Sequence, residues 1–404
     1  NKIYTFYKFF NIIAFMEKIS NLKITDTSYG GAGVGRSNDG IVIFTQKTVT
    51  GDICNVELVA DKKSYAEAKL LEIVTPSKYR IKPECKAYEK CGGCSYGHID
   101  YMEQINIKKS VVEKALRKYI HKNYNIEVVT SSNKGYRLRA TVRSKNGKIG
   151  FYGYSSRDLV LVENCPVIKD TLFQKMKEFS SINNLTGEIY AIENDENISM
   201  ASVKSEESNI NDTSIFDGIM VNNKKYGIGS MNFNTYYGAV AVTYKSFFQA
   251  NRYLLDEFQK YAVSLVSEKM DIVELYAGAG FFTCGLMTKG NVIACESDQT
   301  SSNLGRTLGY NIKTQDSGKF LSKIKKCDTI FLDPPRDGAD KIVIENIKRL
   351  KPYEIIYVSC NPNTLARDII RLEEYYKITN FKLFDMYPDT FHIESVVRLQ
   401  RVNK

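Results

Sequence analysis

A cysteine near the C-terminal end of the sequence occupies a position suited to chemistry. Cys360 lies two residues after the end of an apolar run, 354–358, and precedes a polar turn, 361–364, that can cap a helix. A side chain between a strand and the following helix faces the crevice at the carboxyl ends of the strands. The positive end of that helix favours a thiolate over a thiol. Two interpretations are open here, a reactive nucleophile or a buried structural cysteine, which is a common fate of cysteines.

Acidic residues at the ends of other apolar runs form a second candidate site. The glycine-rich turn 276–280 lets the backbone approach a ligand closely. Glu296 ends the next apolar run, about 20 residues beyond the first glycine, where an acid accepts hydrogen bonds from ribose hydroxyls. NAD and S-adenosylmethionine both carry such a ribose, but the turn lacks the third glycine that favours a pyrophosphate. The pattern therefore favours S-adenosylmethionine, with Asp316 suited to a contact near the adenine and Asp333 beside the bound ligand.

Four cysteines form a third candidate site. Cys85, Cys91 and Cys94 are close in the sequence, and Cys165 stands some 70 residues further along. Four thiolates suit either tetrahedral zinc or a [4Fe–4S] cluster. Zinc sites usually show two close pairs, whereas three of these cysteines are grouped and one is remote, so the spacing favours iron–sulfur. The spacing is not the Cys-x3-Cys-x2-Cys of radical enzymes, and we assign it no radical chemistry.

The elements that must position these residues fall into three predicted domains. Short alternating runs over 16–75, separated by glycine-rich turns, predict a small β-barrel. The region 76–245 is mixed and basic, with a helix over 101–119 and loops or edge strands over 183–213. From 246 to 404 helices alternate with apolar strands, which is typical of a doubly wound α/β domain. Residues 1–15 are interpreted as an upstream extension with no role in the fold.

The composition of the chain limits the classes of function that the protein could have. The 404 residues carry a net charge of +10, and residues 76–148 hold 17 Lys or Arg against 6 Asp or Glu. Such a basic segment, interleaved with tyrosines and glycines, indicates contact with a phosphate backbone, the alternative being a solvated basic face. No apolar run reaches the length of a membrane span. Nine cysteines without a secretory signal indicate a reducing, cytoplasmic location. With three histidines in the chain, a Ser/His/Asp hydrolase is not credible.

Together these motifs resemble the RNA 5-methyluridine methyltransferases, from Met16 to the C-terminus. The resemblance implies a TRAM (OB-like) barrel, a central α+β RNA-binding domain and a Rossmann-like class I methyltransferase domain. It implies a [4Fe–4S] cluster on the four cysteines, and a Phe-x-Gln-x-Asn motif over 247–251. It also implies Cys360 as nucleophile, Glu394 of the closing motif 391–396 as catalytic base, and cofactor contacts at Gln249, Tyr276, Phe281, Glu296, Asp316 and Asp333. Ala277 and Phe281 depart from the residues common in the family, which leaves backbone or packing contacts there in doubt.

The implied chemistry explains why these groups are needed. C5 of uracil becomes nucleophilic only after a thiolate, here that of Cys360, adds at C6. A base, here Glu394, must then remove the C5 proton, and the target base must be flipped into the pocket. Family members with both barrel and cluster typically act on large-subunit ribosomal RNA, so the expected substrate is 23S rRNA, and the expected state is a monomer without DNA or membrane partners.

Three other functions stay open at this point. Family members without the barrel and cluster act on tRNA, so tRNA is the alternative substrate. A cytosine-C5 RNA methyltransferase would usually place its cysteine in a Thr-Cys or Pro-Cys context, which is absent around Cys360. A non-catalytic RNA-binding or assembly protein would not need the intact Cys360 and Glu394.

Overall fold

The computed structural model describes residues 17–62, 64–119, 126–207 and 210–402, so the predicted extension over 1–15 lies outside the described residues. The chain forms two compact units. The first comprises the N-terminal part up to Lys82 together with Ser95–Gln104. The second comprises Pro83–Cys94 and the chain from Ile105 onward. Among the described helices, none combines the length and the apolar composition needed to cross a membrane.

The first unit contains the predicted barrel. Five strands close on themselves in the order β1-β2-β3-β5-β4. Alternate residues point inward and form an apolar core that includes Leu22, Ile24 and Val56. A 2.6 Å ion pair between the buried Asp52, just before β4, and the partly exposed Arg80 ties the barrel to the chain that follows it. The strands are β1 (Lys18–Thr27), β2 (Gly33–Arg36), β3 (Val42–Thr45), β4 (Ile53–Asp61) and β5 (Tyr65–Thr75).

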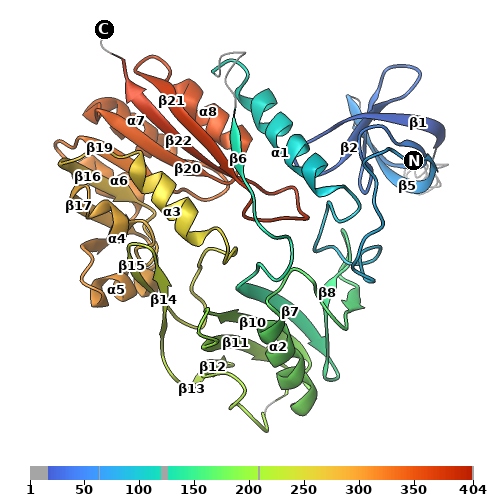
Figure 1. Ribbon diagram of the computed structural model, residues 1–404, viewed down its shortest axis with the longest axis horizontal. Helices are drawn as coiled ribbons and strands as arrows, with labels where there is room; N and C mark the ends of the chain where they lie inside the picture. Colours follow the sequence, from blue (N-terminus) through green and yellow to red (C-terminus); the bar gives the residue numbers. More distant parts are fainter. Residues whose placement is uncertain (1–16, 63, 120–125, 208–209, 403–404) are drawn as a thin grey trace, which may run out of the picture. The chain divides into compact units, whose positions relative to one another are not determined.

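The second unit is built on an eight-stranded sheet, as the doubly wound pattern predicts (Figure 1). The strand order is β18-β17-β16-β19-β20-β22-β21-β6, and β22 is antiparallel to both of its neighbours. Its strands are β6 (Glu127–Val129), β16 (Met270–Leu275), β17 (Gly290–Glu296), β18 (Ile312–Thr314), β19 (Thr329–Leu332), β20 (Glu354–Ser359), β21 (Tyr376–Phe384) and β22 (Glu394–Arg401). The helices that follow along the chain are α3 (Leu255–Ser264), α4 (Thr283–Leu286), α5 (Gln299–Thr307), α6 (Ser317–Lys323), α7 (Lys341–Leu350) and α8 (Pro362–Leu372).

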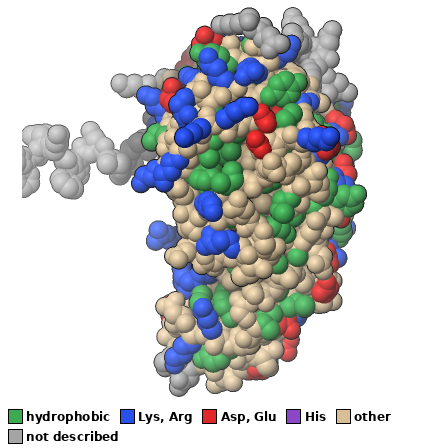
Figure 2. Space-filling view, turned by 90° about the vertical axis from the view of Figure 1, so that its left-hand side faces the viewer, with side chains coloured by type: hydrophobic (Ala, Val, Ile, Leu, Met, Phe, Trp, Pro, Cys, Tyr) green, Lys and Arg blue, Asp and Glu red, His purple; other side chains and the backbone are tan. Residues whose placement is uncertain are grey.

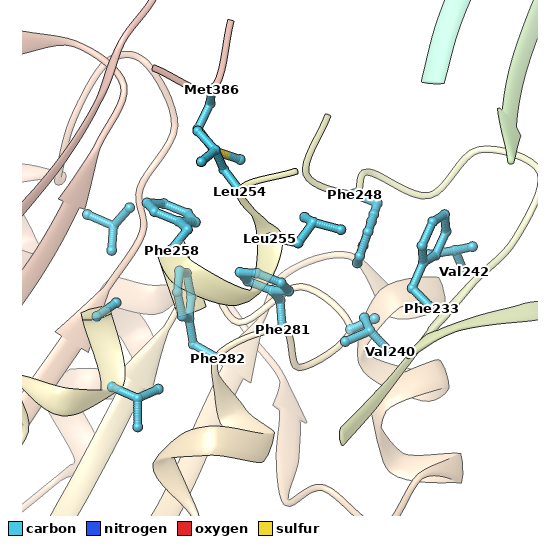
Figure 3. Packing of buried hydrophobic residues seen from close by; sticks show 14 of the residues in the cluster. Phe233, Val240, Val242, Phe248, Leu254, Leu255, Phe258, Phe281, Phe282 and Met386 are labelled. Atoms are coloured by element: carbon cyan, nitrogen blue, oxygen red, sulfur yellow. The ribbon is translucent and has the colours of Figure 1, made fainter. Parts of the chain in front are cut away.

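Each face of this sheet buries its own core, because successive side chains of a strand point to opposite faces. On β20, Ile356 and Val358 join the core formed with α3, whereas Ile355 and Tyr357 join the core formed with α7 and α8. Figure 3 shows part of the first core, where the aromatic rings of Phe248, Phe258, Phe281 and Phe282 gather. The carboxyl ends of the central strands are therefore held by packing on both sides.

The region predicted as a separate central domain also contributes to this sheet. Helix α1 (Tyr101–Leu116) ends three residues before the predicted Tyr119, and its Val112 and Leu116 are buried in the core of α7 and α8. Strand β6 pairs in parallel with β21, where Val128 lies opposite Leu383. Segments before residue 130 thus complete a sheet whose other strands begin after residue 269.

A seven-stranded sheet fills the rest of the region, in the order β13-β12-β11-β10-β7-β8-β9. Helix α2 (Asp170–Ile182) covers one face with Leu172, Phe173 and Met176. The prediction of loops or edge strands over 183–213 is wrong, because β10 and β11 lie inside this sheet. The strands are β7 (Arg139–Lys145), β8 (Lys148–Tyr152), β9 (Leu159–Leu161), β10 (Gly187–Glu193), β11 (Ser199–Ser205), β12 (Gly218–Val221) and β13 (Lys224–Gly227), with a separate hairpin of β14 (Met231–Thr235) and β15 (Gly238–Val242).

The misleading polarity of 183–213 has a physical cause. On β10, Ile189 and Ala191 are fully buried toward α2, whereas Glu188 and Tyr190 point to the other face and are partly exposed. Partly exposed and buried residues alternate in this way wherever a strand lies in the sheet, so polarity alone does not place it at an edge.

Candidate active site

Strand register brings Cys360 and Glu394 together. Ser359, the last residue of β20, lies opposite Ser395 on the antiparallel β22, so Cys360 and Glu394 occupy the next position along the two strands. Asp333 directly follows β19, the neighbour of β20 on its other side. As predicted, a helix follows at once: α8 begins at Pro362, and the Asn361 side chain caps it by accepting a hydrogen bond from the backbone N–H of Asn363 at 3.0 Å.

The surroundings of Cys360 favour the thiol over the thiolate. Burial and, next, the carboxyl groups of Glu394 and Asp333 together raise its pKa to about 12, against the lowering effect of the Arg336 guanidinium. The predicted preference for a thiolate at the helix end does not outweigh these effects. The thiol therefore needs a change in its surroundings, such as an arriving ligand, before it can act as a nucleophile.

Two carboxyl groups accompany the thiol, and both resist ionisation. Glu394 is 7% exposed, and burial, followed by the nearby Asp333, raises its pKa well above the ordinary value, while Arg336 lowers it. Burial raises the pKa of Asp333 to about 7. Neighbouring carboxylates disfavour each other's charge, so the site tends to hold a proton on Glu394. A glutamate with such high proton affinity is a strong base once it is ionised.

Arg336 is a functional candidate that our sequence analysis missed. It follows Asp333 and two prolines, and its positive charge lowers the pKa of both Cys360 and Glu394. Its carbonyl oxygen accepts hydrogen bonds from the Asn361 side chain at 3.1 Å and the Thr364 hydroxyl at 3.2 Å, so its loop is fastened to the start of α8. Its position in the sequence, just after an acid at a strand end, could have indicated a role in the site.

The loop before β22, which leads to Glu394, is held by buried side chains. Lys108 of α1 forms a 2.5 Å ion pair with Asp385, and both side chains are almost completely buried. The Lys108 ammonium also donates to the carbonyl of Tyr387 at 3.0 Å. The Tyr136 hydroxyl donates to the carbonyl of Pro388 at 3.0 Å. These contacts fix the approach to Glu394 from two segments remote in sequence.

The glycine-rich turn and Glu296 meet, as the predicted cofactor site requires. Gly278 and Gly280 have φ values of +57° and +98°, a region that favours glycine. The Gly278 N–H donates to the Glu296 carboxylate at 2.9 Å, which places this acid beside the turn. A Cβ built on Gly278 would meet no atom within 4 Å, so the turn borders open space. These features fit a ligand with a hydroxyl-bearing ribose.

The remaining predicted cofactor residues differ in their position relative to the strand ends and in their contacts. Tyr276 (φ 62°), like Asp333, lies at the carboxyl end of a central strand. Asp316 follows β18, and its side chain caps α6 by accepting a hydrogen bond from the Lys319 N–H at 2.9 Å. Gln249 is 7% exposed and follows Phe248 in the segment before α3.

Phe281 does not lie as a cofactor-facing side chain would. It is 8% exposed and packs in the core of Figure 3, with its ring centroid 4.8 Å from that of Phe282 and 5.9 Å from that of Phe248. This packing therefore disfavours contact between the Phe281 side chain and a ligand. The Phe281 backbone is the part available to the site.

The four clustered cysteines lie on loops of the second unit. Cys94 and Cys165 pack against the core of the seven-stranded sheet, and none of the cysteines forms a disulfide. Burial raises the pKa of Cys94 to about 12, with a further contribution from Cys165, and that of Cys165 to about 11, with a small contribution from Cys85. The thiols are thus within electrostatic reach of one another, and Arg137 opposes the shift at both Cys94 and Cys165.

The four thiols are chemically suited to bind a metal group, but their arrangement in the structure is not that of a metal site. Within the described ranges, no three or more His, Cys, Asp or Glu side chains are arranged so that they could hold a metal ion. Four cysteine thiolates are nevertheless the ligands that a [4Fe–4S] cluster takes. The iron–sulfur assignment therefore stays a prediction.

Charge is unevenly distributed on the surface. On the face drawn in Figure 2, lysine and arginine side chains gather along one edge, and aspartate and glutamate lie mainly toward the opposite edge. A polyanionic ligand would be oriented by such a distribution.

Comparison with known proteins agrees with the class of enzyme that this sheet and site define, a methyltransferase. The TRAM domain model matches residues 18–71, and the tRNA (Uracil-5-)-methyltransferase model matches residues 317–402. An RNA methyltransferase of Synechocystis is 30% identical, over 95% of this chain and 96% of the relative. The 23S rRNA (uracil(1939)-C(5))-methyltransferase RlmD of Shewanella halifaxensis is 28% identical, over 95% and 96%.

A solved structure shares the fold. The tRNA (uracil-54, C5)-methyltransferase of Pyrococcus abyssi, in complex with S-adenosyl-L-homocysteine, matches with a TM-score of 0.77 and 24% identity, over 94% of this chain and 99% of that one. The resemblance predicted from the motifs is confirmed: the chain belongs to the S-adenosylmethionine-dependent RNA uracil-C5 methyltransferase family.

Proposed function

We propose that this enzyme transfers a methyl group from S-adenosylmethionine to C5 of a uridine in 23S rRNA, with Cys360 as nucleophile and Glu394 as base. The observation that carries the proposal is the pairing of β20 with β22, which sets the thiol and the carboxyl side by side. The flanking strand adds Asp333, and the adjacent loop adds Arg336.

The first step activates the uracil ring. The Cys360 thiol gives its proton to solvent water, and the resulting thiolate adds to C6, so that the electrons of the C5–C6 double bond move onto C5 and the C4 carbonyl as an enolate. Arg336 favours this step, because its positive charge lowers the pKa of the thiol. A uridine that enters the site also displaces water from around these groups, which strengthens the effect of that charge.

The second step forms the new carbon–carbon bond. C5 attacks the methyl group of the sulfonium, and S-adenosylhomocysteine leaves as the neutral thioether. Glu296 and the turn at Gly278 would hold the ribose of the donor, and Tyr276, Asp316, Asp333 and Gln249 would complete its binding. The donor is consumed in each turnover, so S-adenosylhomocysteine must leave before the next cycle.

The third step restores the aromatic base. The ionised Glu394 carboxylate accepts the C5 proton, the bond between Sγ and C6 breaks, and 5-methyluridine leaves. The raised pKa of Glu394 suits this role, because a base of high proton affinity is needed for a weakly acidic C–H. The step requires that Glu394 be ionised in the adduct, and Glu394 must pass the C5 proton to solvent before the next turnover.

The four cysteines Cys85, Cys91, Cys94 and Cys165 would hold the [4Fe–4S] cluster. Methyl transfer moves no net electron to or from a metal, so a cluster there would crosslink the loops of the RNA-binding region and add charge to it. Arg137 is positioned to balance the negative charge of the thiolates, since it already lowers the pKa of Cys94 and Cys165.

Ribosomal RNA is favoured over tRNA as the substrate because the chain combines a barrel with the cysteine set. Mapping 5-methyluridine in ribosomal RNA and tRNA from cells with and without the gene tests this choice. We expect a uridine of 23S rRNA to lose its methyl group when the gene is absent. Loss confined to tRNA would reassign the substrate, and no loss together with no tritium transfer from labelled S-adenosylmethionine would favour a non-catalytic RNA-binding role.

A further inference from the structure

We propose that the face of the seven-stranded sheet not covered by α2 is a platform for unpaired nucleotides of the RNA substrate. The inference rests on the proposed function in taking RNA as the ligand. It adds where, outside the methyl-transfer site, the flanking nucleotides bind and by which contacts.

The register of β7 defines this face. Ala140, Val142 and Ser144 are buried toward α2, so the alternate residues, among them Arg143 and Lys145, point to the other side. Both strands that neighbour β7 follow the same alternation. The exposed part of the face lies toward β8 and the Arg143 end of β7, because Ile192, Met200 and Met220 on the same side are buried in the core of α3.

Pairing between strands extends the platform on both sides of Arg143. Gly150 of β8 and Glu188 of β10 lie opposite Arg143, which places Lys148 and Tyr152 of β8 on the same face. Lys204 of β11 lies opposite Glu188 and continues the row. Residues from four consecutive strands thus contribute to one surface.

The platform carries a strong excess of positive charge. Among the described residues that register places on this face, Glu188 is the one acid, and it already forms ion pairs with Arg143 and with Lys204, the latter at 3.6 Å. Positive charge spread over a sheet surface complements a polyanion. The basic residues on this face are Arg139, Arg143, Lys145, Lys148, Lys204 and Lys225.

An exposed aromatic ring supplies the second contact that unpaired RNA needs. Tyr152 is 41% exposed, and the Arg143 guanidinium lies 4.9 Å from its ring centroid. Bases of single-stranded RNA stack on such rings, whatever their sequence, and arginine adds a cation–π contribution. Exposed tyrosine beside arginine and lysine thus favours RNA over an acidic protein, which would gain little from a stacking surface.

The segment that carries Gln249 borders the exposed part of this face. The Tyr190 hydroxyl of β10 donates to the carbonyl of Ser246 at 2.8 Å, and Nε of Arg139 donates to the carbonyl of Phe248 at 2.6 Å. One end of the platform therefore lies next to a predicted cofactor-binding segment, so that nucleotides flanking the target uridine can reach it.

The test compares variants of the full-length protein in binding an RNA oligonucleotide that carries the target uridine in an unpaired loop. Fluorescence anisotropy at several salt concentrations gives the Kd. We expect Tyr152→Ala to weaken binding about 5- to 150-fold, the range for loss of one stacked base, and Tyr152→Phe to stay within about twofold of the wild type. For Lys145→Gln with Lys148→Gln, the slope of log K against log salt should fall by about 1.4, or about 0.7 for each phosphate contact to a single strand.

A matched double variant removes the same charge elsewhere. Lys323 of α6 is exposed and Lys348 of α7 is partly exposed, and both helices cover the eight-stranded sheet. Lys323→Gln with Lys348→Gln should leave both the Kd and the salt slope near the wild-type values.

The outcomes separate this inference from the proposed function. Wild-type affinity and salt slope in both platform variants would overturn the platform, and an equal loss in Tyr152→Phe and Tyr152→Ala would overturn stacking. If the wild type binds the RNA with these dependences but methylates no uridine, the platform stands and the proposed function fails.

Discussion

The chain holds cysteines in two contrasting settings. Cys360 stands alone at the end of β20, beside two carboxyl groups, and strand pairing fixes its position. Cys94 and Cys165 lie on loops with two further cysteines, and their positions depend on packing against the seven-stranded sheet. Burial raises the thiol pKa in both settings, and one arginine opposes the rise in each, Arg336 or Arg137. The difference lies in the neighbours: a lone thiol beside a base suits transient covalent chemistry, whereas thiols beside thiols suit a permanent ligand.

Replacing the lone thiol should have the largest effect. We expect Cys360→Ser to lower kcat by a factor on the order of 10³ or more, the scale seen when a covalent nucleophile is removed. Binding of S-adenosylmethionine, measured by calorimetry, should survive. Cys327, buried just before β19, is the matched control, and Cys327→Ala should keep most of the activity. Near-normal turnover by Cys360→Ser would remove the thiol from the mechanism.

Replacing a grouped thiol should act on metal content and structure rather than on the chemical step. Anaerobically purified protein should contain about four iron and four sulfide per chain, as a cubane cluster requires. Cys94→Ser should lower that content and the unfolding temperature, with a smaller loss of kcat than Cys360→Ser gives. Stoichiometric zinc would contradict the cluster, and unchanged folding and activity after its removal would contradict its organising role.

The loop before Glu394 is held in position by buried side-chain contacts, whereas strand pairing positions Cys360. Lys108 and Asp385 are about 1% and 0% exposed, so Lys108→Met leaves a buried carboxylate without its cation. We expect the free energy of unfolding to fall by about 3–5 kcal/mol in urea titrations. Adding Asp385→Leu should recover most of this loss, because the unpaired charge is then gone. No recovery would mean that Lys108 stabilises the fold through contacts other than this pair.

Arg336 should tune the lone thiol without being essential. Its positive charge lowers the pKa of Cys360 and of Glu394, so Arg336→Met raises both. The rising limb of kcat/KM against pH should move upward by about one unit, and the loss of activity should shrink as pH rises. Arg371→Met on α8 is the control and should leave the profile in place. A uniform loss at every pH would indicate a role in binding or folding instead.

The sequence predicts the strand-end site well and the loops poorly, for physical reasons. Apolar runs that end in Cys360, Glu296 and Asp333 locate strands, and parallel strands bring their carboxyl ends to one edge. The pairing of β6 with β21 and of Lys108 with Asp385 joins segments more than 250 residues apart, and such contacts leave no local pattern.

Phe281 shows a different limit. The family resemblance implies a cofactor contact at Phe281, but a phenylalanine gains more by packing with Phe248 and Phe282. Whether a residue next to a site faces the ligand or the core depends on its partners in space, which lie on other segments.

The pairing of Cys360 with Glu394 is the central claim, and one variant tests it most directly. Glu394→Gln keeps the shape of the side chain but cannot accept the C5 proton, so methyl transfer can proceed while release cannot. With target RNA and S-adenosylmethionine, denaturing gels should show a covalent protein–RNA adduct, and mass spectrometry should find a methylated nucleotide on the peptide that contains Cys360. Adding Cys360→Ser should abolish the adduct. No adduct with an RNA that the wild type methylates, or an adduct on another cysteine, would contradict the account.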